Sequence, residues 1–334
     1  MAWYNTVGKE NDIILSSRVR FARNLAGFPF GSRLKDEQAH QIVDQVSALL
    51  AQNGFEKKEN LSPIEALSYV EKHYISREFA EKKGPHALLT NDPCGYAVMV
   101  CEEDHLRMQC ILPGLALDEA YASLCRLDDL MDAHFEVAFD ERFGYLTHCP
   151  TNLGTGMRAS VMMFLPALTM AGRIGLLASQ LSKLGLTMRG LYGEGTSAQG
   201  NLYQISNQIT LGLTEEDTIK KLSDVIRQIC ESERSLRKLI NEEQNPGLVD
   251  RICRAEGILR HAFLLTSGEF ISLYSDVRLG ISLGILSGLA YEQLDELFVD
   301  VMPATLALAD PSAAKGEKAR DILRAKCIKD ALGR

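Results

Sequence analysis

Short apolar runs alternate with longer helical patterns over the first two thirds of the chain. Residues 13–15, 96–101 and 108–112 are apolar runs, whereas apolar positions recur at helical spacing over 36–52 and 117–131. Only a few polar residues separate 96–101 from 107–112, which is typical of two antiparallel strands joined by a tight turn. The pattern predicts an α+β unit in which helices flank an antiparallel sheet.

The pattern changes after residue 213, where apolar positions recur almost entirely at helical spacing. Thr214 precedes three acidic residues and resembles the N-cap of a long helix. Pro or Gly breaks at 246–247, 267–268, 303 and 311 divide the rest into several helices. We therefore predict an α+β domain over 12–235 and an all-helical C-terminal domain over 236–334.

Composition limits the classes of function. The chain has 334 residues, of which 46% are hydrophobic, and this length suits two folded units. A formal net charge of −8 argues against direct nucleic-acid binding, and no apolar run is long enough for a signal sequence or a membrane span. The eight cysteines contain no Cys-x-x-Cys pair, which favours reduced thiols over a zinc site. We expect a cytoplasmic protein with no membrane partner.

Two stretches of this acidic chain contain no Asp or Glu but several arginines. They are 13–35, with Arg18 and Arg20, and 142–193, with Arg158 and Arg189. On a strand, Arg18 and Arg20 would point to one face, where they could hold a polyphosphate. A solvated basic edge is the ordinary alternative.

A Gly-rich turn over 152–158 places backbone amides beside Arg158, and the apolar stretch over 159–171 that follows predicts a helix. Amides and an arginine together favour an anion site. Gly154-x-Gly156-x-x-Ala159 could instead be a dinucleotide fingerprint, but the acidic residue expected about 20 positions later is absent. Walker-type and ordinary protein-kinase motifs are also absent.

Five segments in a fixed order resemble the phosphagen (guanidino) kinases, and within them the bacterial protein-arginine kinases of the McsB type. The segments are Ser16-Ser17-Arg18-Val19-Arg20; His73; 102–107 (Glu-Glu-Asp-His-Leu-Arg); 149–155 (Cys-Pro-Thr-Asn-Leu-Gly-Thr) with Arg158-Ala159-Ser160-Val161-Met162; and Arg189-Gly190-Leu191-Tyr192-Gly193-Glu194. The resemblance extends from residue 12 to about 235.

The resemblance implies the roles of these residues. Every residue of the first and last segments, together with His73, Arg107 and 158–162, is expected to bind ATP, with Arg18, Arg20, Arg107, Arg158 and Arg189 around the phosphates. Glu103 and Glu194 match the family's catalytic carboxylates, and Cys149 matches its active-site thiol, which we expect to lie among cations. Mg²⁺ is expected to be held mainly through ATP oxygens and water, so we assign no protein metal ligand.

The implied chemistry suits these residue types. Phosphoryl transfer demands in-line positioning and charge neutralisation, which arginines supply. A guanidinium is protonated at its usual pKa and is a poor nucleophile, so carboxylates must hold it and favour loss of a proton. Glu103 and Glu194 are the expected pair.

The phosphate acceptor is inferred from a feature in which this sequence differs from the small-molecule members of the family. Small-molecule members begin with an additional helical domain that closes over the free substrate, whereas here a short segment precedes the strand with Arg18. We therefore expect arginine side chains of proteins as acceptors. A kinase for free arginine or another guanidino metabolite is the alternative enzyme, and a non-catalytic phosphoarginine-binding adaptor is the alternative of another class.

The C-terminal part contains a second motif. Arg320-Asp321-Ile-Leu-Arg324-Ala325 resembles the motif with which protein-arginine kinases bind phosphoarginine, and its arginines lie one helical turn apart. A mixed-charge helix face is the ordinary explanation. The resemblance further implies a homodimer, a Clp-type ATPase and protease that degrade the marked proteins, a zinc-containing activator and a heat-shock repressor.

Overall fold

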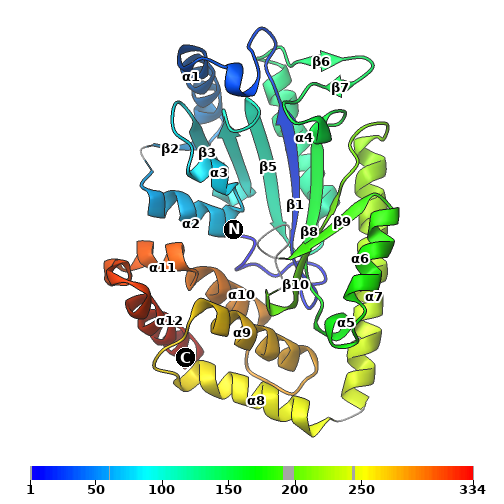
Figure 1. Cartoon of the computed structure of the whole chain (residues 1–334), viewed down its shortest axis with the longest axis vertical. Helices are drawn as coiled ribbons and strands as arrows, with labels where there is room; N and C mark the ends of the chain where they lie inside the picture. The colour runs from blue at the N-terminus through cyan, green and yellow to red at the C-terminus, as the bar shows by residue number, and fades with distance from the viewer. Residues whose placement is uncertain (1, 60, 191–198, 243–244, 334) are drawn as a thin grey trace.

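The protein is described here from a computed structural model that covers residues 2–59, 61–190, 199–242 and 245–333. Its described strands form one eight-stranded antiparallel sheet and a separate two-stranded hairpin (Figure 1). In spatial order the sheet contains β2 (Glu56–Lys58), β3 (Ala87–Asn91), β4 (Tyr96–Val100), β5 (Leu106–Pro113), β1 (Ile14–Arg23), β8 (Met157–Phe164), β10 (Leu202–Asn207) and β9 (Leu186–Gly190). The hairpin pairs β6 (Phe139–Asp140) with β7 (Gly144–Tyr145).

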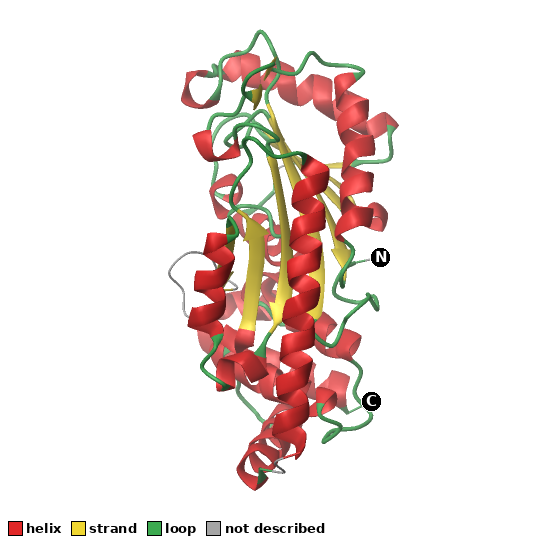
Figure 2. Ribbon diagram, turned by 90° about the vertical axis from the view of Figure 1, so that its right-hand side faces the viewer, coloured by secondary structure: helices red, strands yellow, loops and turns green. Residues whose placement is uncertain are grey.

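Helices cover both faces of this sheet, and the side view shows them running along the strands (Figure 2). In the α+β part they are α1 (Asp36–Gln52), α2 (Pro63–His73), α3 (Arg77–Ala80), α4 (Leu117–Asp132), α5 (Pro166–Met170), α6 (Ile174–Lys183) and α7 (Glu215–Glu242). The C-terminal part contains α8 (Pro246–His261), α9 (Ser267–Ser282), α10 (Tyr291–Asp300), α11 (Pro303–Ala309) and α12 (Glu317–Leu332). Short 3-10 turns occur at Gly31–Arg33, Asp92–Cys94, Pro150–Asn152, Gln199–Asn201 and Pro311–Lys315.

The two faces of the sheet have different environments. One face packs against α1, α4 and α7 and forms the main apolar core, to which β1 contributes Val19 and Phe21. The opposite face is covered by α2 and α3 at one side and by the C-terminal helices at the end of β1, β5 and β8, where Ile111 and Met162 join the helical core. A polar stretch of this second face lies between these two coverings, and it contains the candidate site.

The predicted fold class is confirmed. The strands near 96–101 and 107–112 pair as β4 and β5, with Tyr96 opposite Cys110. The helix predicted over 36–52 is α1, and Thr214 caps the start of α7 by accepting a hydrogen bond from the Asp217 N–H (3.1 Å). The expected domain boundary at 235/236 lies inside α7, which runs on to Glu242.

One predicted element is wrong. The stretch over 159–171 is not a helix, because Met157–Phe164 is the central strand β8 between β1 and β10, and only the short α5 follows it. Both faces of β8 are buried, since Ala159 and Val161 lie in the main core while Met162 and Phe164 lie in the helical core. Apolar residues on both faces hide the two-residue period of a strand.

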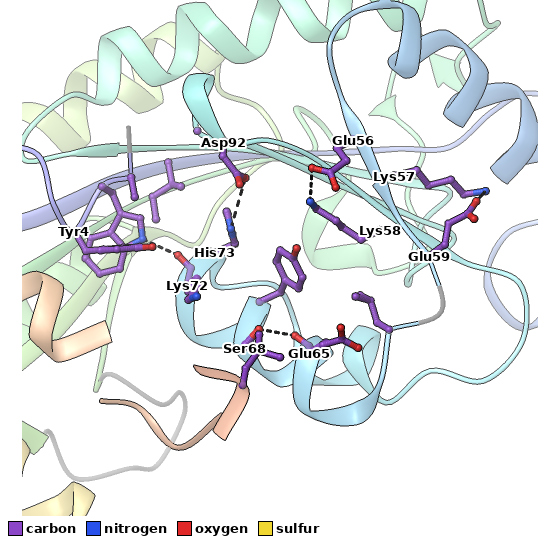
Figure 3. Close-up of a pocket in the computed structure, with 17 residues that line it drawn as sticks. Tyr4, Glu56, Lys57, Lys58, Glu59, Glu65, Ser68, Lys72, His73 and Asp92 are labelled. Atoms are coloured by element: carbon purple, nitrogen blue, oxygen red, sulfur yellow. Dashed lines mark hydrogen bonds and ion pairs between the residues drawn. The ribbon is translucent and has the colours of Figure 1, made fainter. Parts of the chain in front are cut away.

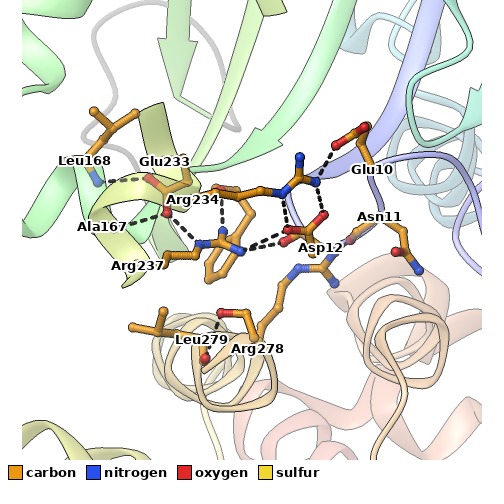
Figure 4. A network of polar contacts seen from close by, with 12 residues as sticks. Glu10, Asn11, Asp12, Ala167, Leu168, Glu233, Arg234, Arg237, Arg278 and Leu279 are labelled. Atoms are coloured by element: carbon orange, nitrogen blue, oxygen red, sulfur yellow. Dashed lines mark hydrogen bonds and ion pairs between the residues drawn. The ribbon is translucent and has the colours of Figure 1, made fainter. Parts of the chain in front are cut away.

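A buried network of charges joins the two parts of the chain (Figure 4). The Glu233 carboxylate on α7 accepts hydrogen bonds from the first two N–H groups of α5 (3.0 and 2.9 Å) and from Arg237 Nε (2.9 Å). Arg237 Nη1 donates to the Asp12 carbonyl (3.1 Å), and Arg278 on α9 donates to the Asn11 carbonyl (2.5 Å). These contacts fix the segment that leads directly into β1.

All eight cysteines are free thiols. Among the described helices, none is both long and apolar enough to cross a membrane.

Candidate active site

The arginines identified from the sequence share one face of the sheet. Arg18 and Arg20 alternate on β1, Arg20 pairs with Arg158 on β8, and Ala22 pairs with Arg107 on β5. Arg189 on β9 pairs with Gln204 on β10, which stands on the same face. Paired residues of neighbouring strands point to the same side, so the sheet brings the five arginines together.

The surroundings of Arg18 and Arg20 are strongly cationic. Burial lowers the pKa of Arg18 to about 10; the neighbouring Tyr74 opposes this shift, while Arg158 and Arg107 add to it. Burial, followed by repulsion from Arg18, Arg107 and Arg158, places the pKa of Arg20 well below its usual value. The buried Nε atoms of both side chains have no hydrogen-bond partner among the described residues. An arrangement of like charges with unused donors fits a bound polyanion such as the phosphates of ATP.

The turn between β4 and β5 anchors one of these arginines. Arg107 Nη1 donates to Glu102 Oε1 (2.6 Å), and the Ser76 hydroxyl donates to the same oxygen (2.5 Å). Burial would raise the pKa of Glu102, but the Arg107 charge and the hydrogen bonds from Ser76 and the Glu103 N–H outweigh it and lower the pKa. Glu102 is therefore a structural anion that orients Arg107 and is not available as a base.

Glu103 has the opposite character. Its carboxylate is half-buried, and burial followed by repulsion from Asp104 raises its pKa, with Glu102 adding to the effect. Arg107 and His148 lie close enough to oppose the shift. A carboxylate with a raised pKa at the edge of an arginine cluster suits proton transfer.

Asp104 is a residue that motif reasoning left without a role. It is 3% exposed, and its Oδ1 accepts hydrogen bonds from Asn24 Nδ2 (2.6 Å) and from the His148 N–H (2.7 Å). Asp104 thus ties the turn that contains Glu103 to the segment that begins at His148 and Cys149. The fact that Asp104 follows Glu103 directly in the sequence is the feature from which a role in the site could have been predicted.

Cys149 stands at the start of the Pro150–Asn152 turn. Its Sγ lies 3.0 Å from Thr151 Oγ1, and its carbonyl accepts a hydrogen bond from the Thr147 hydroxyl (2.8 Å). Thr210 fixes the turn by donating to the carbonyls of Thr151 (3.0 Å) and Leu153 (2.7 Å). Gly154 has φ +108°, and a Cβ there would lie 2.3 Å from the Thr210 carbonyl oxygen, so the turn requires glycine.

The other predicted residues of the first segment, of 158–162 and of the last segment differ in where they lie. Ser17, Val19, Ala159 and Val161 belong to the matching strands but point to the opposite, core face, whereas Ser16, Ser160 and Met162 share the arginine face. Gly190 ends β9. Leu191, Tyr192, Gly193 and Glu194, including the second expected carboxylate, lie outside the described residues.

His73 ends α2 and lines a cavity of about 490 Å³ (Figure 3). Its Nε2 lies 3.8 Å from Asp92 Oδ1, and its ring packs against Tyr69. Burial lowers the pKa of His73, although Asp92 opposes the shift. The His73 carbonyl, in contrast, accepts a hydrogen bond from Gln109 Nε2 (2.5 Å) on the arginine face.

The second motif lies on α12. Arg324 is 1% exposed and donates to the carbonyls of Val301 (3.0 Å) and Leu265 (2.8 Å) and to Asp321 Oδ1 (2.6 Å). Ala325 lies in the helical core, and Arg320 is only half-buried. Arg324 is therefore part of the internal packing, while Arg320 reaches the surface.

An antiparallel sheet that gathers arginines on one face, with a poised carboxylate at its edge, defines a phosphotransferase of the guanidino-kinase class. Comparison with known proteins agrees. Residues 36–236 match the family described as ATP:guanido phosphotransferase, C-terminal catalytic domain, and residues 245–334 match the family described as Protein-arginine kinase McsB C-terminal domain. The chain belongs to the protein-arginine kinase family and is a kinase.

Close relatives extend over almost the whole chain. A protein-arginine kinase of Syntrophomonas wolfei is 44% identical over 99% of this chain and 95% of its own length. One of Caldanaerobacter subterraneus is 45% identical over 89% of this chain and 90% of its own length.

Solved structures share the fold. The duplicated taurocyamine kinase from Schistosoma mansoni with bound transition state analog components is similar with a TM-score of 0.62 and 25% identity over 74% of this chain, which spans 38% of that duplicated protein. Lombricine kinase shares the fold at a TM-score of 0.60 and 21% identity, over 70% of this chain and 68% of its own.

Proposed function

We propose that this protein transfers the γ-phosphoryl group of ATP to arginine side chains of other proteins. The observation that carries the proposal is the arginine face itself: the buried Nε atoms of Arg18 and Arg20 have no hydrogen-bond partner among the described residues. Glu103, a carboxylate with a raised pKa, lies near Arg107 of the same face. The near full-length similarity to curated protein-arginine kinases supports the choice of acceptor.

The five arginines of the face hold the phosphates. Charge-assisted donors arranged in advance neutralise the charge that develops during phosphoryl transfer without having to reorganise. Arg107 is held in place by Glu102, and Arg158 Nη2 donates to Ser206 Oγ (3.0 Å), so both are fixed before a ligand arrives. MgATP supplies the transferred group, with Mg²⁺ held mainly through nucleotide oxygens and water.

Glu103 is the proposed base. A P–N bond forms to one guanidinium nitrogen of the acceptor while the P–O bond between the γ-phosphorus and the leaving ADP breaks, and the proton of that nitrogen passes to a carboxylate. The raised pKa of Glu103 makes it a better proton acceptor than an ordinary glutamate. Glu194 is the proposed second carboxylate by family resemblance, and Cys149 is proposed to orient the guanidinium.

The helical domain is the proposed reader of the product. Arg320, which is only half-buried on α12, would contact a phosphoarginine, while Arg324 and Asp321 would keep the helix in place. Homodimer formation, degradation of marked proteins by a Clp-type machine, and partnership with a zinc-containing activator and a heat-shock repressor are further proposals that rest on resemblance alone.

Phosphorylation of a small guanidino metabolite is the second candidate. This candidate is supported by the similarity to the structure of a taurocyamine kinase, because the taurocyamine in that enzyme's name is a small guanidino compound. The two candidates share the arginine face and Glu103 and differ only in the acceptor.

Transfer from radiolabelled MgATP to an unfolded, arginine-bearing polypeptide tests the proposal. The wild type should produce a protein-bound label that acid removes, because the P–N bond is acid-labile. Glu103→Gln should lose transfer by at least about 100-fold, as expected for a general base, yet still bind MgATP. The exposed Glu37→Gln is the control. Full transfer by Glu103→Gln would refute the assignment, and a wild type that only binds phosphoarginine would favour the adaptor.

A further inference from the structure

Three consecutive carbonyls at the C-terminal end of α2 accept hydrogen bonds from side chains. The Lys72 carbonyl accepts from Trp3 Nε1 (2.8 Å), the His73 carbonyl from Gln109 Nε2 (2.5 Å) and the Tyr74 carbonyl from Arg18 Nη1 (2.8 Å). A helix C-terminus carries a partial negative charge and leaves its last carbonyls without helical partners. The end of α2 therefore provides a hydrogen-bond acceptor, the Tyr74 carbonyl, that positions the Arg18 guanidinium.

Tyr74 strengthens this contact. Its backbone is left-handed (φ +51°), which ends α2 and turns the chain at this point. The Arg18 guanidinium lies 5.5 Å from the centre of the Tyr74 ring, and the Trp3 ring stacks on Tyr74 with ring centres 5.2 Å apart. Arg18 is thus held by a carbonyl and an aromatic ring of the same residue.

Glu71 connects this end of α2 to the helical domain. Its two carboxylate oxygens accept hydrogen bonds from the N–H groups of Ala304 (3.0 Å) and Thr305 (2.7 Å), in the first turn of α11. These N–H groups have no partner within α11, so the carboxylate caps the helix. Glu71 lies one helical turn from Tyr74, so α2 transmits the position of α11 to the residue that holds Arg18.

We propose that Glu71 is a positioning residue of the nucleotide site and that the helical domain, through α11, sets the geometry of Arg18. The inference rests on the proposed role of Arg18 in holding ATP phosphates. A rigid helix fixed at Glu71 and contacting Arg18 at Tyr74 leaves little freedom in the guanidinium. When the Glu71 contact is lost, the end of α2 shifts, Arg18 moves with it, and nucleotide affinity falls while the polypeptide site keeps its geometry.

Nucleotide titration of Glu71 variants tests the proposal in the full-length protein. Glu71→Ala should weaken MgATP binding by about 3- to 10-fold and raise KM for ATP by a similar factor, because small displacements of a charged donor weaken its contact. KM for the polypeptide should stay within about twofold, since the polypeptide does not bind at Arg18. Glu71→Gln keeps one acceptor oxygen and should give a smaller change.

Two further variants separate positioning from folding. Glu65→Gln removes a carboxylate that caps only the start of α2, through the Ser62 N–H (2.7 Å), and should leave nucleotide affinity unchanged. Ala304→Pro removes one donor of the contact without touching α2, and proline is tolerated in a first helical turn, so it should mimic Glu71→Gln. A Glu71→Ala protein that unfolds at lower temperature but binds MgATP like the wild type would overturn the proposal.

Arg18→Met distinguishes this inference from the proposed function. If Arg18→Met binds MgATP like the wild type, the arginine face does not hold the nucleotide and the proposed function fails with it. If Arg18→Met loses affinity while the Glu71 and Ala304 variants keep it, only the positioning role is refuted.

Discussion

Replacing Arg20 by Met should stabilise the ligand-free protein and, at the same time, remove most of its affinity for ATP. Arg20 lies among Arg18, Arg107 and Arg158, with Glu102 as the nearby opposing charge, and its buried Nε has no hydrogen-bond partner among the described residues. Its charge therefore costs free energy in the folded state unless an anion is bound.

The magnitude follows from this environment. Replacing a buried ion pair by well-packed apolar side chains of similar volume is often neutral or stabilises a protein by about 1–4 kcal/mol. Because three arginines repel Arg20, we expect a gain of about 1–3 kcal/mol for Arg20→Met. For a chain of this size that gain corresponds to a rise of about 1–4 °C in unfolding temperature. Loss of a charge-assisted contact worth about 1.5–3 kcal/mol should weaken ATP binding by about 10- to 100-fold.

Thermal unfolding with and without MgATP measures both effects in one assay. The wild type should gain stability from MgATP, whereas Arg20→Met should start higher and gain little. Arg173→Met is the control, because Arg173 is exposed in the second acid-free stretch, 142–193, and its unfolding should change by no more than about 0.5 kcal/mol. A lower unfolding temperature for ligand-free Arg20→Met would refute the repulsion argument, and an unchanged response to MgATP would refute the phosphate assignment.

Three other predictions address the base, its anchor and the buried network. Glu103 acts as a base only when it is unprotonated, and its pKa is raised, so kcat/KM for a polypeptide should fall as the pH decreases, with a midpoint above 4.5, the ordinary pKa of glutamate. A midpoint at or below that value would contradict its role as the base. Asp104→Ala, which removes the acceptor, should lower kcat by about 10-fold or more with KM for ATP nearly unchanged, because the turn holding Glu103 loses its tie to His148. Steady-state kinetics that show the reverse split would exclude this role. Glu233→Leu should lower the free energy of unfolding in urea by up to about 3–5 kcal/mol, since the buried Arg237 would keep only the more distant Asp12 carboxylate (3.6 Å). A loss no larger than that of the exposed Glu231→Leu would show that the network adds no stability.

Local patterns were sufficient to predict much of the fold and the face that carries the site. The helix over 36–52 has one apolar stripe, which appears in the sequence as apolar residues at helical spacing. The β4–β5 pair appears as two apolar runs separated by a short polar turn. Arg18 and Arg20 occupy alternate strand positions, which fixes their common face without knowledge of the neighbours.

Other features depend on contacts that no local pattern records. Strand β8 was mistaken for a helix because its two faces are both buried, one of them by helices that follow it far along the chain. The carbonyl of Tyr74 reaches Arg18 over a separation of 56 residues, and Glu71 reaches α11 over 233. Every residue has a backbone carbonyl, so the sequence alone does not show that the carbonyl of Tyr74 is the one that accepts a hydrogen bond from Arg18.

The proposed function requires that the phosphate reaches arginine within a protein. Phosphorus NMR of the purified protein with MgATP, an unfolded arginine-bearing polypeptide and free arginine in one tube shows which acceptor receives it. We predict a new acid-labile N-phosphoguanidino resonance that stays with the polypeptide fraction when small molecules are removed. The same resonance confined to free arginine would contradict the claim and assign the protein as a kinase of a small guanidino metabolite.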